Sequence, residues 1–128
     1  MSSTPAAPPG GPEPLGPYSP SVLARGELTF VSGQTPVDPT TGRLVEGDFA
    51  RQVEQAFANV SAVLATTGLA LDQVVKVTVF LRSMDDFAAL NAAYERVFTP
   101  PYPARTTVAV AGLPLDARVE IEVFAARG

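Results

Sequence analysis

The sequence predicts an α+β domain in which a mixed β-sheet has two helices packed on one face. Two segments repeat apolar residues at helical spacing, and several shorter segments alternate apolar and polar residues as strands do. Their order along the chain is strand, strand, helix, strand, helix, strand, strand. The chain has 128 residues, of which 46% are hydrophobic, so it is long enough for one core of this kind.

The N-terminal segment 1–17 is predicted to be a flexible Pro/Gly-rich tail. It holds six of the thirteen prolines and three of the ten glycines, and it has few bulky apolar side chains. A proline-motif ligand for a partner domain is the alternative interpretation. The folded domain is predicted over residues 18–128. Its first two strands are expected at 21–25 and 27–32, joined at Gly26 as a hairpin.

Two helices are predicted from apolar spacing and from their end signals. The first begins near Asp48, whose side chain can cap the free amides, and ends near Gly68. The second follows Ser83 and Asp86, which resemble a capping box, and ends at the prolines of 100–103. The apolar faces consist of Phe49, Val53, Ala56, Phe57, Val60 and Leu64 in the first helix, and of Phe87, Leu90, Tyr94 and Phe98 in the second.

Three further strands are predicted at 74–81, 106–111 and 117–126. If both helices cover one face of the sheet, its other face exposes apolar groups in a single chain. The residues expected there are Thr78, Phe80, Phe124 and Ala126. Large exposed apolar patches mark interfaces, so the sequence predicts a closed homo-oligomer. Coverage of this face by loops or by the tail is the alternative.

Composition excludes several classes of chemistry. The chain has no histidine, cysteine or tryptophan, which rules out histidine triads, thiol nucleophiles, Cys/His zinc sites and disulfides. The acidic residues show no metal-ligand spacing, so no metal site is predicted. A net charge of −4 with scattered arginines disfavours nucleic acid as a partner. No apolar run is long enough to span a membrane and no signal peptide is evident, so a cytoplasmic protein is expected.

Two opposite charges lie inside the most apolar stretches of the chain. Arg105 opens the segment 105–110, and Glu120 lies within 117–123. Desolvating either charge costs several kcal/mol unless something binds it, which makes both residues candidates for function. If their strands are near each other, Arg105 and Glu120 are expected to border one pocket. A plain cross-strand salt bridge is the alternative.

Six segments carry a family resemblance. In order and spacing, they are similar to the RidA (YjgF) family of enamine/imine deaminases over about residues 16–126. The segments are Gly16-Pro17-Tyr18-Ser19, Phe30-Val31-Ser32-Gly33-Gln34-Thr35-Pro36, Val74-Val75-Lys76-Val77-Thr78-Val79-Phe80-Leu81, Asn91-Ala92-Ala93-Tyr94, Pro103-Ala104-Arg105-Thr106-Thr107 and Val119-Glu120-Ile121-Glu122.

The resemblance implies a chorismate-mutase-like fold, a homotrimeric barrel and ligand sites between subunits. It also implies cofactor-independent hydrolysis of reactive 2-imino acids, the tautomers of enamines such as 2-aminoacrylate, to 2-keto acids and ammonia. Arg105 matches the family's carboxylate-binding arginine, and Glu120 matches the glutamate that positions the attacking water. The further substrate-binding positions that the family match implies are Tyr18, Ser32, Gly33, Asn91 and Thr107.

Two departures from the family pattern bear on these expectations. Many members have cysteine where this chain has Thr107, so only a backbone role transfers there, and Pro20 replaces a frequent glutamine at the pocket rim. Tyr18, Ser32 and Asn91 also have purely structural interpretations, as an anchor, a turn residue and a helix-backbone partner. The functional alternatives are a pathway-specific enzyme and a non-catalytic trimer that binds a small carboxylate.

Overall fold

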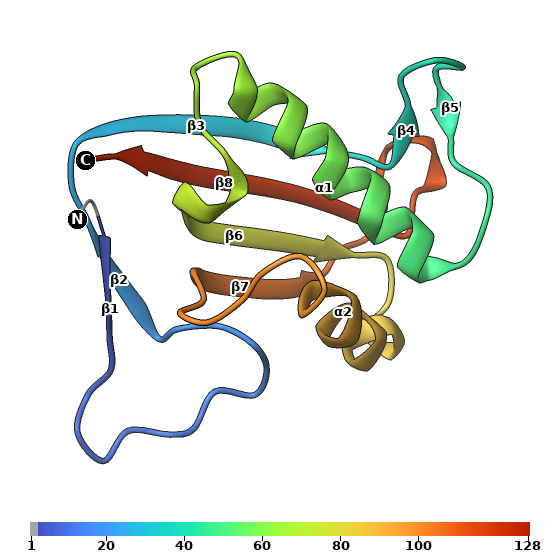
Figure 1. Ribbon diagram of the computed structural model, residues 1–128. Coiled ribbons are helices and arrows are strands. Elements are labelled where there is room, and N and C mark those ends of the chain that lie inside the picture. Colours follow the sequence, from blue (N-terminus) through green and yellow to red (C-terminus); the bar gives the residue numbers. More distant parts are fainter. Residues whose placement is uncertain (1–2) are drawn as a thin grey trace.

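The computed structural model describes residues 3–128 and contains a four-stranded mixed sheet with two helices (Figure 1). The strand order is β3-β8-β6-β7. Strand β6 pairs parallel with β7 and antiparallel with β8, and β3 pairs antiparallel with β8. The strands span Glu27–Gln34 (β3), Val74–Leu81 (β6), Ala104–Ala109 (β7) and Val119–Arg127 (β8). The predicted mixed sheet is confirmed, with β3 and β7 at its edges.

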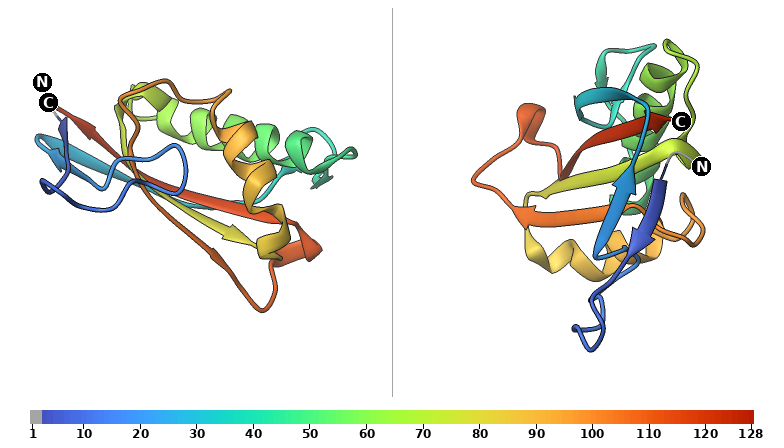
Figure 2. Two further views of the ribbon diagram at one scale, coloured as in Figure 1. Left: turned by 90° about the horizontal axis from the view of Figure 1, so that it is seen from below. Right: turned by 90° about the vertical axis from the view of Figure 1, so that its left-hand side faces the viewer.

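Both helices cover the same face of this sheet, as predicted (Figure 2, left). Helix α1 spans Phe49–Ala65, and the Asp48 carboxylate caps it by accepting a hydrogen bond from the Arg51 amide at 3.0 Å. Helix α2 spans Phe87–Tyr94 and follows a short 3₁₀ turn that Ser83 caps. Gly68, with φ of +75°, lies where the chain leaves the first helix, in the left-handed conformation that favours glycine.

The hydrophobic core lies between the helices and the covered face of the sheet. Alternate residues of the two central strands are fully buried there, as the period-2 pattern predicts. These residues are Val77, Val79 and Leu81 of β6, and Val119, Ile121 and Val123 of β8. They pack against the apolar faces of α1 and α2, which include Val53, Phe57, Val60, Leu64 and Leu90.

The N-terminal part of the chain differs from the expectation. Strand β1 (Ser3–Ala6) lies within the segment expected to be a flexible tail, and it pairs antiparallel with β2 (Ser21–Ala24). The predicted hairpin between the segments 21–25 and 27–32 is therefore wrong. Gly26 explains the difference, because its φ is +94° and a Cβ there would come within 1.7 Å of the Arg127 carbonyl oxygen. At this close approach the chain leaves the sheet, and β3 pairs with β8 alone.

A small two-stranded ribbon lies between β3 and α1. It consists of β4 (Val37–Asp38) and β5 (Arg43–Leu44). The turn that joins them ends at Gly42, whose φ is +72°, and the Asp38 carboxylate accepts a hydrogen bond from the Thr40 amide at 2.8 Å. The turn predicted over this Asp-Pro sequence is thus present.

The face of the sheet away from the helices, called the open face below, carries exposed apolar side chains. Phe30 is 66% exposed and Leu28 is 50% exposed, and the ring of Phe30 packs edge-on against that of Phe124 at 5.0 Å. The expectation that Ala126 is exposed on this face is wrong: Ala126, the register partner of Leu28, is fully buried, and its small methyl group leaves little surface to expose.

In residues 3–128 the structure contains no helix that is long and apolar enough to cross a membrane.

Candidate functional site: two half-sites on opposite faces

Arg105 lies on edge strand β7 and points to the helix-covered side of the sheet. Its register partner on β6 is Val77, a core residue of that side. The arginine is only 8% exposed, and its Nη2 donates a hydrogen bond to Asn91 Oδ1 of α2 at 2.8 Å. Asn91 therefore orients the guanidinium in this structure, a role that is additional to the substrate contact expected for it.

Aromatic rings form the walls around the guanidinium. Its Cζ lies 5.1 Å from the ring centroid of Tyr18, 5.7 Å from that of Phe87 and 5.0 Å from that of Tyr94. Burial lowers the pKa of Arg105, while the neighbouring Tyr94 and Tyr18 raise it. Aromatic rings thus enclose this cation, and no carboxylate of residues 3–128 forms a salt bridge with it. This arrangement favours a bound anion.

Several buried polar atoms around Arg105 have no hydrogen-bond partner. Within residues 3–128, these atoms are Arg105 Nε, Arg105 Nη1, Thr107 Oγ1 and Tyr94 Oη. Thr107 follows Arg105 on the same face of β7, because their register partners Val77 and Val79 share a face of β6. Buried donors without partners are rare and costly, so this cluster is typical of a site that a ligand completes. Its charge and donors suit a small carboxylate.

The segment before β2 closes this region from the outside. The Ser19 amide donates to the Pro103 carbonyl oxygen at 3.0 Å, which holds the segment along the start of β7. The Tyr18 hydroxyl accepts a hydrogen bond from the Leu15 amide at 3.0 Å. At Gly16 a Cβ would lie 2.7 Å from Asn91 Oδ1, so only glycine fits here without displacing the arginine's partner. We call Gly16, Tyr18, Asn91, Arg105 and Thr107 the arginine half-site.

Glu120 lies on the open face with a different set of neighbours. Its register partner is Phe80 of β6, and the pairing of β3 with β8 is irregular between Val31 and Gln34, next to this position. At Gly33 a Cβ would come within 1.9 Å of Glu120 Oε2, so the carboxylate lies directly against this backbone. Ser32 beside it is exposed. We call Ser32, Gly33 and Glu120 the glutamate half-site.

The two half-sites do not meet within one chain. Strand β6 lies between β7 and β8, which separates their backbones by roughly 9.5 Å. In addition, Arg105 points to the helix side of the sheet and Glu120 points to the open face. The expectation that Arg105 and Glu120 border one pocket is therefore wrong for a single chain. The cross-strand salt bridge between them is excluded for the same reason.

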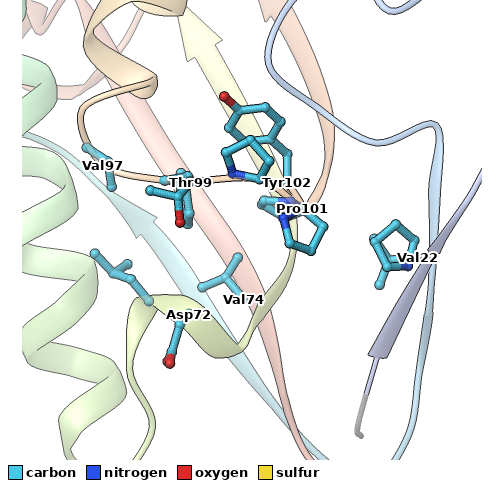
Figure 3. A pocket seen from close by; sticks show the side chains of 12 residues that line it. Val22, Asp72, Val74, Val97, Thr99, Pro101 and Tyr102 are labelled. Atoms are coloured by element: carbon cyan, nitrogen blue, oxygen red, sulfur yellow. The ribbon is translucent and has the colours of Figure 1, made fainter.

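A cavity of about 300 Å³ lies elsewhere, between the β1–β2 ribbon and the loop that precedes β7. Figure 3 shows Val22 on one side of it and Pro101 and Tyr102 on the other. Its lining is mostly apolar and proline-rich, and Asp72 is its one charged residue. Because neither half-site borders this cavity, it does not contribute to the chemistry of Arg105 or Glu120.

The described residues 3–128 contain no group of three or more His, Cys, Asp or Glu side chains that could hold a metal ion. The groups that the two half-sites present are a guanidinium, a carboxylate, hydroxyls and backbone amides. These groups can hold a small anion and move a proton to or from water.

Phe87 and Tyr94 were predicted only as part of an apolar helix face, and their place around Arg105 was missed. One signal in the sequence points to it. Tyr94 follows Asn91 by three residues, so the two side chains share a helix face, and a tyrosine in a core position usually has a partner for its hydroxyl.

Comparisons with known proteins show a family and a fold to which this chain is similar. A family model described as Endoribonuclease L-PSP matches residues 9–127. A 2-iminobutanoate/2-iminopropanoate deaminase of Salmonella typhimurium is 44% identical over 119 residues, which are 91% of each chain. The crystal structure of RidA from an Antarctic Psychrobacter is 40% identical, with a TM-score of 0.76 over 91% of this chain and 93% of that one. Escherichia coli TdcF with bound serine is 38% identical, with a TM-score of 0.75 and the same coverage.

Proposed function

The chain belongs to the Endoribonuclease L-PSP family, the YjgF/RidA family, and from this premise we propose that it hydrolyses reactive 2-imino acids to 2-keto acids and ammonia. The observation that carries the proposal is the buried guanidinium of Arg105 with unpaired donors inside an aromatic box. Relatives at 43% and 44% identity bear the name 2-iminobutanoate/2-iminopropanoate deaminase. A net charge of −4 and a buried arginine argue against an RNA-cleaving surface, which the family description suggests.

In this proposal Arg105 binds the substrate carboxylate. A guanidinium can hold a carboxylate through two parallel N–H···O bonds, which fixes the orientation of the attached imine carbon. Asn91 holds the guanidinium through its hydrogen bond, and Gly16 leaves the space that Asn91 needs. The rings of Tyr18, Phe87 and Tyr94 keep water away from the ion pair. Low local polarity strengthens this attraction relative to water.

The active site is proposed to form between two copies of the chain. Because Arg105 and Glu120 lie on opposite faces of one sheet, a molecule of a few atoms cannot contact both in one copy. The exposed apolar side chains of the open face, Leu28, Phe30 and Phe124, favour burial against a second copy. A closed ring in which each open face meets the next copy's β7 edge would bring the halves together, and a homotrimer is the ring we propose.

The reaction then needs only water and a carboxylate that accepts a proton. Glu120 of the partner subunit takes a proton from water as its oxygen forms a bond to the imine carbon, and the C=N electron pair moves to nitrogen. The resulting carboxylic acid gives this proton to that nitrogen, which forms a carbinolamine. The Glu120 carboxylate then takes the proton of the new hydroxyl and passes it to the same nitrogen, so that the C–N bond breaks, ammonia leaves and the C=O bond of the keto acid forms. General acid–base catalysis of this kind is worth about 10²- to 10⁴-fold. No cofactor takes part in these steps.

A trimer that binds a small carboxylate without catalysis is a second candidate. Escherichia coli TdcF, at 38% identity, has serine bound in its crystal structure, and serine is a small molecule with a carboxylate. The arginine half-site alone would serve such a binding function. A pathway-specific enzyme is a narrower form of the first proposal, and Pro20 and Thr107 are the residues whose departure from the family pattern bears on substrate range.

The test is hydrolysis of an imine that an amino-acid oxidase generates in the assay. We expect wild-type protein to accelerate keto-acid release, and we expect Arg105→Ala and Glu120→Ala each to lose about 10²-fold or more of kcat/KM. Lack of acceleration by wild type would refute the enzyme proposal and leave the binding trimer. Loss in Arg105→Ala with full activity in Glu120→Ala would remove only the role given to Glu120.

A further inference from the structure

Tyr94 is a fully buried tyrosine at the end of α2, inside a cluster of aromatic rings. Its ring centroid lies 5.9 Å from that of Phe57 and 4.8 Å from that of Phe98. A phenylalanine would make the same ring contacts. The hydroxyl group is therefore the part of Tyr94 that packing does not explain.

The Tyr94 hydroxyl has no hydrogen-bond partner among residues 3–128, although it is buried. Buried tyrosine hydroxyls usually have a hydrogen-bond partner, and a buried hydroxyl without one lowers the stability of the fold. Asn91, one turn earlier on α2, accepts a hydrogen bond from Arg105 Nη2 through its Oδ1 and is not a partner of this hydroxyl. The hydroxyl thus lacks a partner in the part of the chain that the structure describes.

The position of Tyr94 beside Arg105 identifies the kind of partner that fits. The Cζ of Arg105 lies 5.0 Å from the Tyr94 ring centroid, and Nε and Nη1 of the same guanidinium are also buried without partners in residues 3–128. All of these unpaired groups are donors. An acceptor with two oxygens and a negative charge would pair with donors from both residues at once.

We propose that the Tyr94 hydroxyl is a further substrate-binding group, which donates a hydrogen bond to the carboxylate that Arg105 holds. The inference rests on the proposed function, because it extends the same carboxylate site by one donor. It assigns Tyr94 a role in binding, and it leaves proton transfer to the glutamate half-site.

The protonation state of Tyr94 agrees with a donor role. Burial raises the pKa of Tyr94 well above its usual value, and the positive charge of Arg105 opposes this only in part. The phenol is therefore neutral over the whole physiological pH range and keeps the proton that it donates. It cannot act as a base, so its removal is expected to raise KM and to change kcat little.

The test compares wild type, Tyr94→Phe and a matched control, Tyr102→Phe. Tyr102 is a half-buried tyrosine of the same region and borders the cavity of about 300 Å³ (Figure 3). Among residues 3–128, the rings that lie against the Arg105 guanidinium are those of Tyr18, Phe87 and Tyr94, so Tyr102 is not one of them. For each protein, pyruvate binding is measured by calorimetry, KM and kcat by imine hydrolysis, and thermal stability by melting. Pyruvate serves as a stable 2-keto acid whose binding does not depend on turnover.

We expect Tyr94→Phe to weaken pyruvate binding and to raise KM by about tenfold or more. The melting temperature is expected to be equal or higher, because the lost hydroxyl has no partner among residues 3–128. Tyr102→Phe is expected to change pyruvate affinity by less than twofold.

Two results for Tyr94→Phe would overturn the inference. One is a pyruvate affinity within twofold of that of wild type. The other is a lower melting temperature, which would indicate that the hydroxyl has a structural partner. Pyruvate binding that depends on Tyr94 in a protein without imine hydrolysis would refute the proposed function alone. Absence of any pyruvate binding by wild type would overturn the inference directly.

Discussion

Mixed trimers of two inactive variants test whether one active site draws on two chains. Arg105→Ala removes the proposed carboxylate anchor, and Glu120→Ala removes the proposed proton acceptor. Each variant alone, assembled as the proposed homotrimer, is expected to be nearly inactive. The strand registers place these side chains on opposite faces of the sheet, so each crevice is proposed to take its arginine from one chain and its glutamate from the next.

The expected activity of a mixed trimer follows from this arrangement. In a closed ring each chain contributes Arg105 to one crevice and Glu120 to the neighbouring one. A trimer that contains both variants has one junction at which an intact Arg105 meets an intact Glu120, whichever variant is in excess. We therefore expect mixed trimers to recover about a third of wild-type kcat, against about 1% for either variant alone.

The assay requires trimers of mixed composition. The two variants are co-expressed with different affinity tags, and assemblies that carry both tags are isolated in two steps before keto-acid release is measured. The control pairs Arg105→Ala chains with chains that carry both substitutions, which leaves no intact arginine. Mixed trimers no more active than the separate variants would refute the two-chain site and would require both charges to act from one chain.

Three further predictions concern single positions. In Gly33→Ala the new Cβ would displace the Glu120 carboxylate by about 1 Å or more, so kcat is expected to fall by about 10²-fold while pyruvate affinity stays within threefold, as calorimetry would check. In Phe30→Ser the loss of a 66% exposed ring from the open face is expected to raise the subunit dissociation constant about tenfold or more; an unchanged mass in light scattering on dilution would contradict this. Asp86→Ala removes the carboxylate that lies 2.7 Å from Arg118 Nη2, and chemical unfolding should show that the free energy of unfolding falls by about 1–3 kcal/mol. A decrease below about 0.5 kcal/mol would mean that this ion pair is no stronger than an exposed one.

The parts of the fold that depend on local signals were predictable from the sequence. Asp48 caps α1 as its side chain suggests, and the alternation of Val74–Leu81 gives β6 its two faces. Pairing partners were not predictable in the same way. The predicted hairpin failed because strand propensity at Ser21–Ala24 says nothing about which strand it pairs with, and a strand at Ser3–Ala6 was missed in a segment that proline dominates.

The candidate site shows the same limit. Charge in an apolar context identified Arg105 and Glu120 as candidates, and alternation gave the face of each strand. Whether these two side chains meet depends on strand order and on pairing register. The order places β6 between the two strands, and the registers place Arg105 and Glu120 on opposite faces of the sheet. The missing partner of Tyr94 Oη depends on tertiary packing, so the sequence could only indicate that a tyrosine occupies a core position.

The placement of the two charges on opposite sides of one sheet has a consequence for inheritance. In the proposed ring, a chain substituted at both positions would inactivate two crevices when it assembles with intact copies, because its Arg105 and its Glu120 would belong to crevices with different neighbours. In a cell that makes both forms, defective alleles of this gene would therefore act partly as dominant ones. A substitution confined to the core would instead remove its own chain from the pool and leave the remaining assemblies intact.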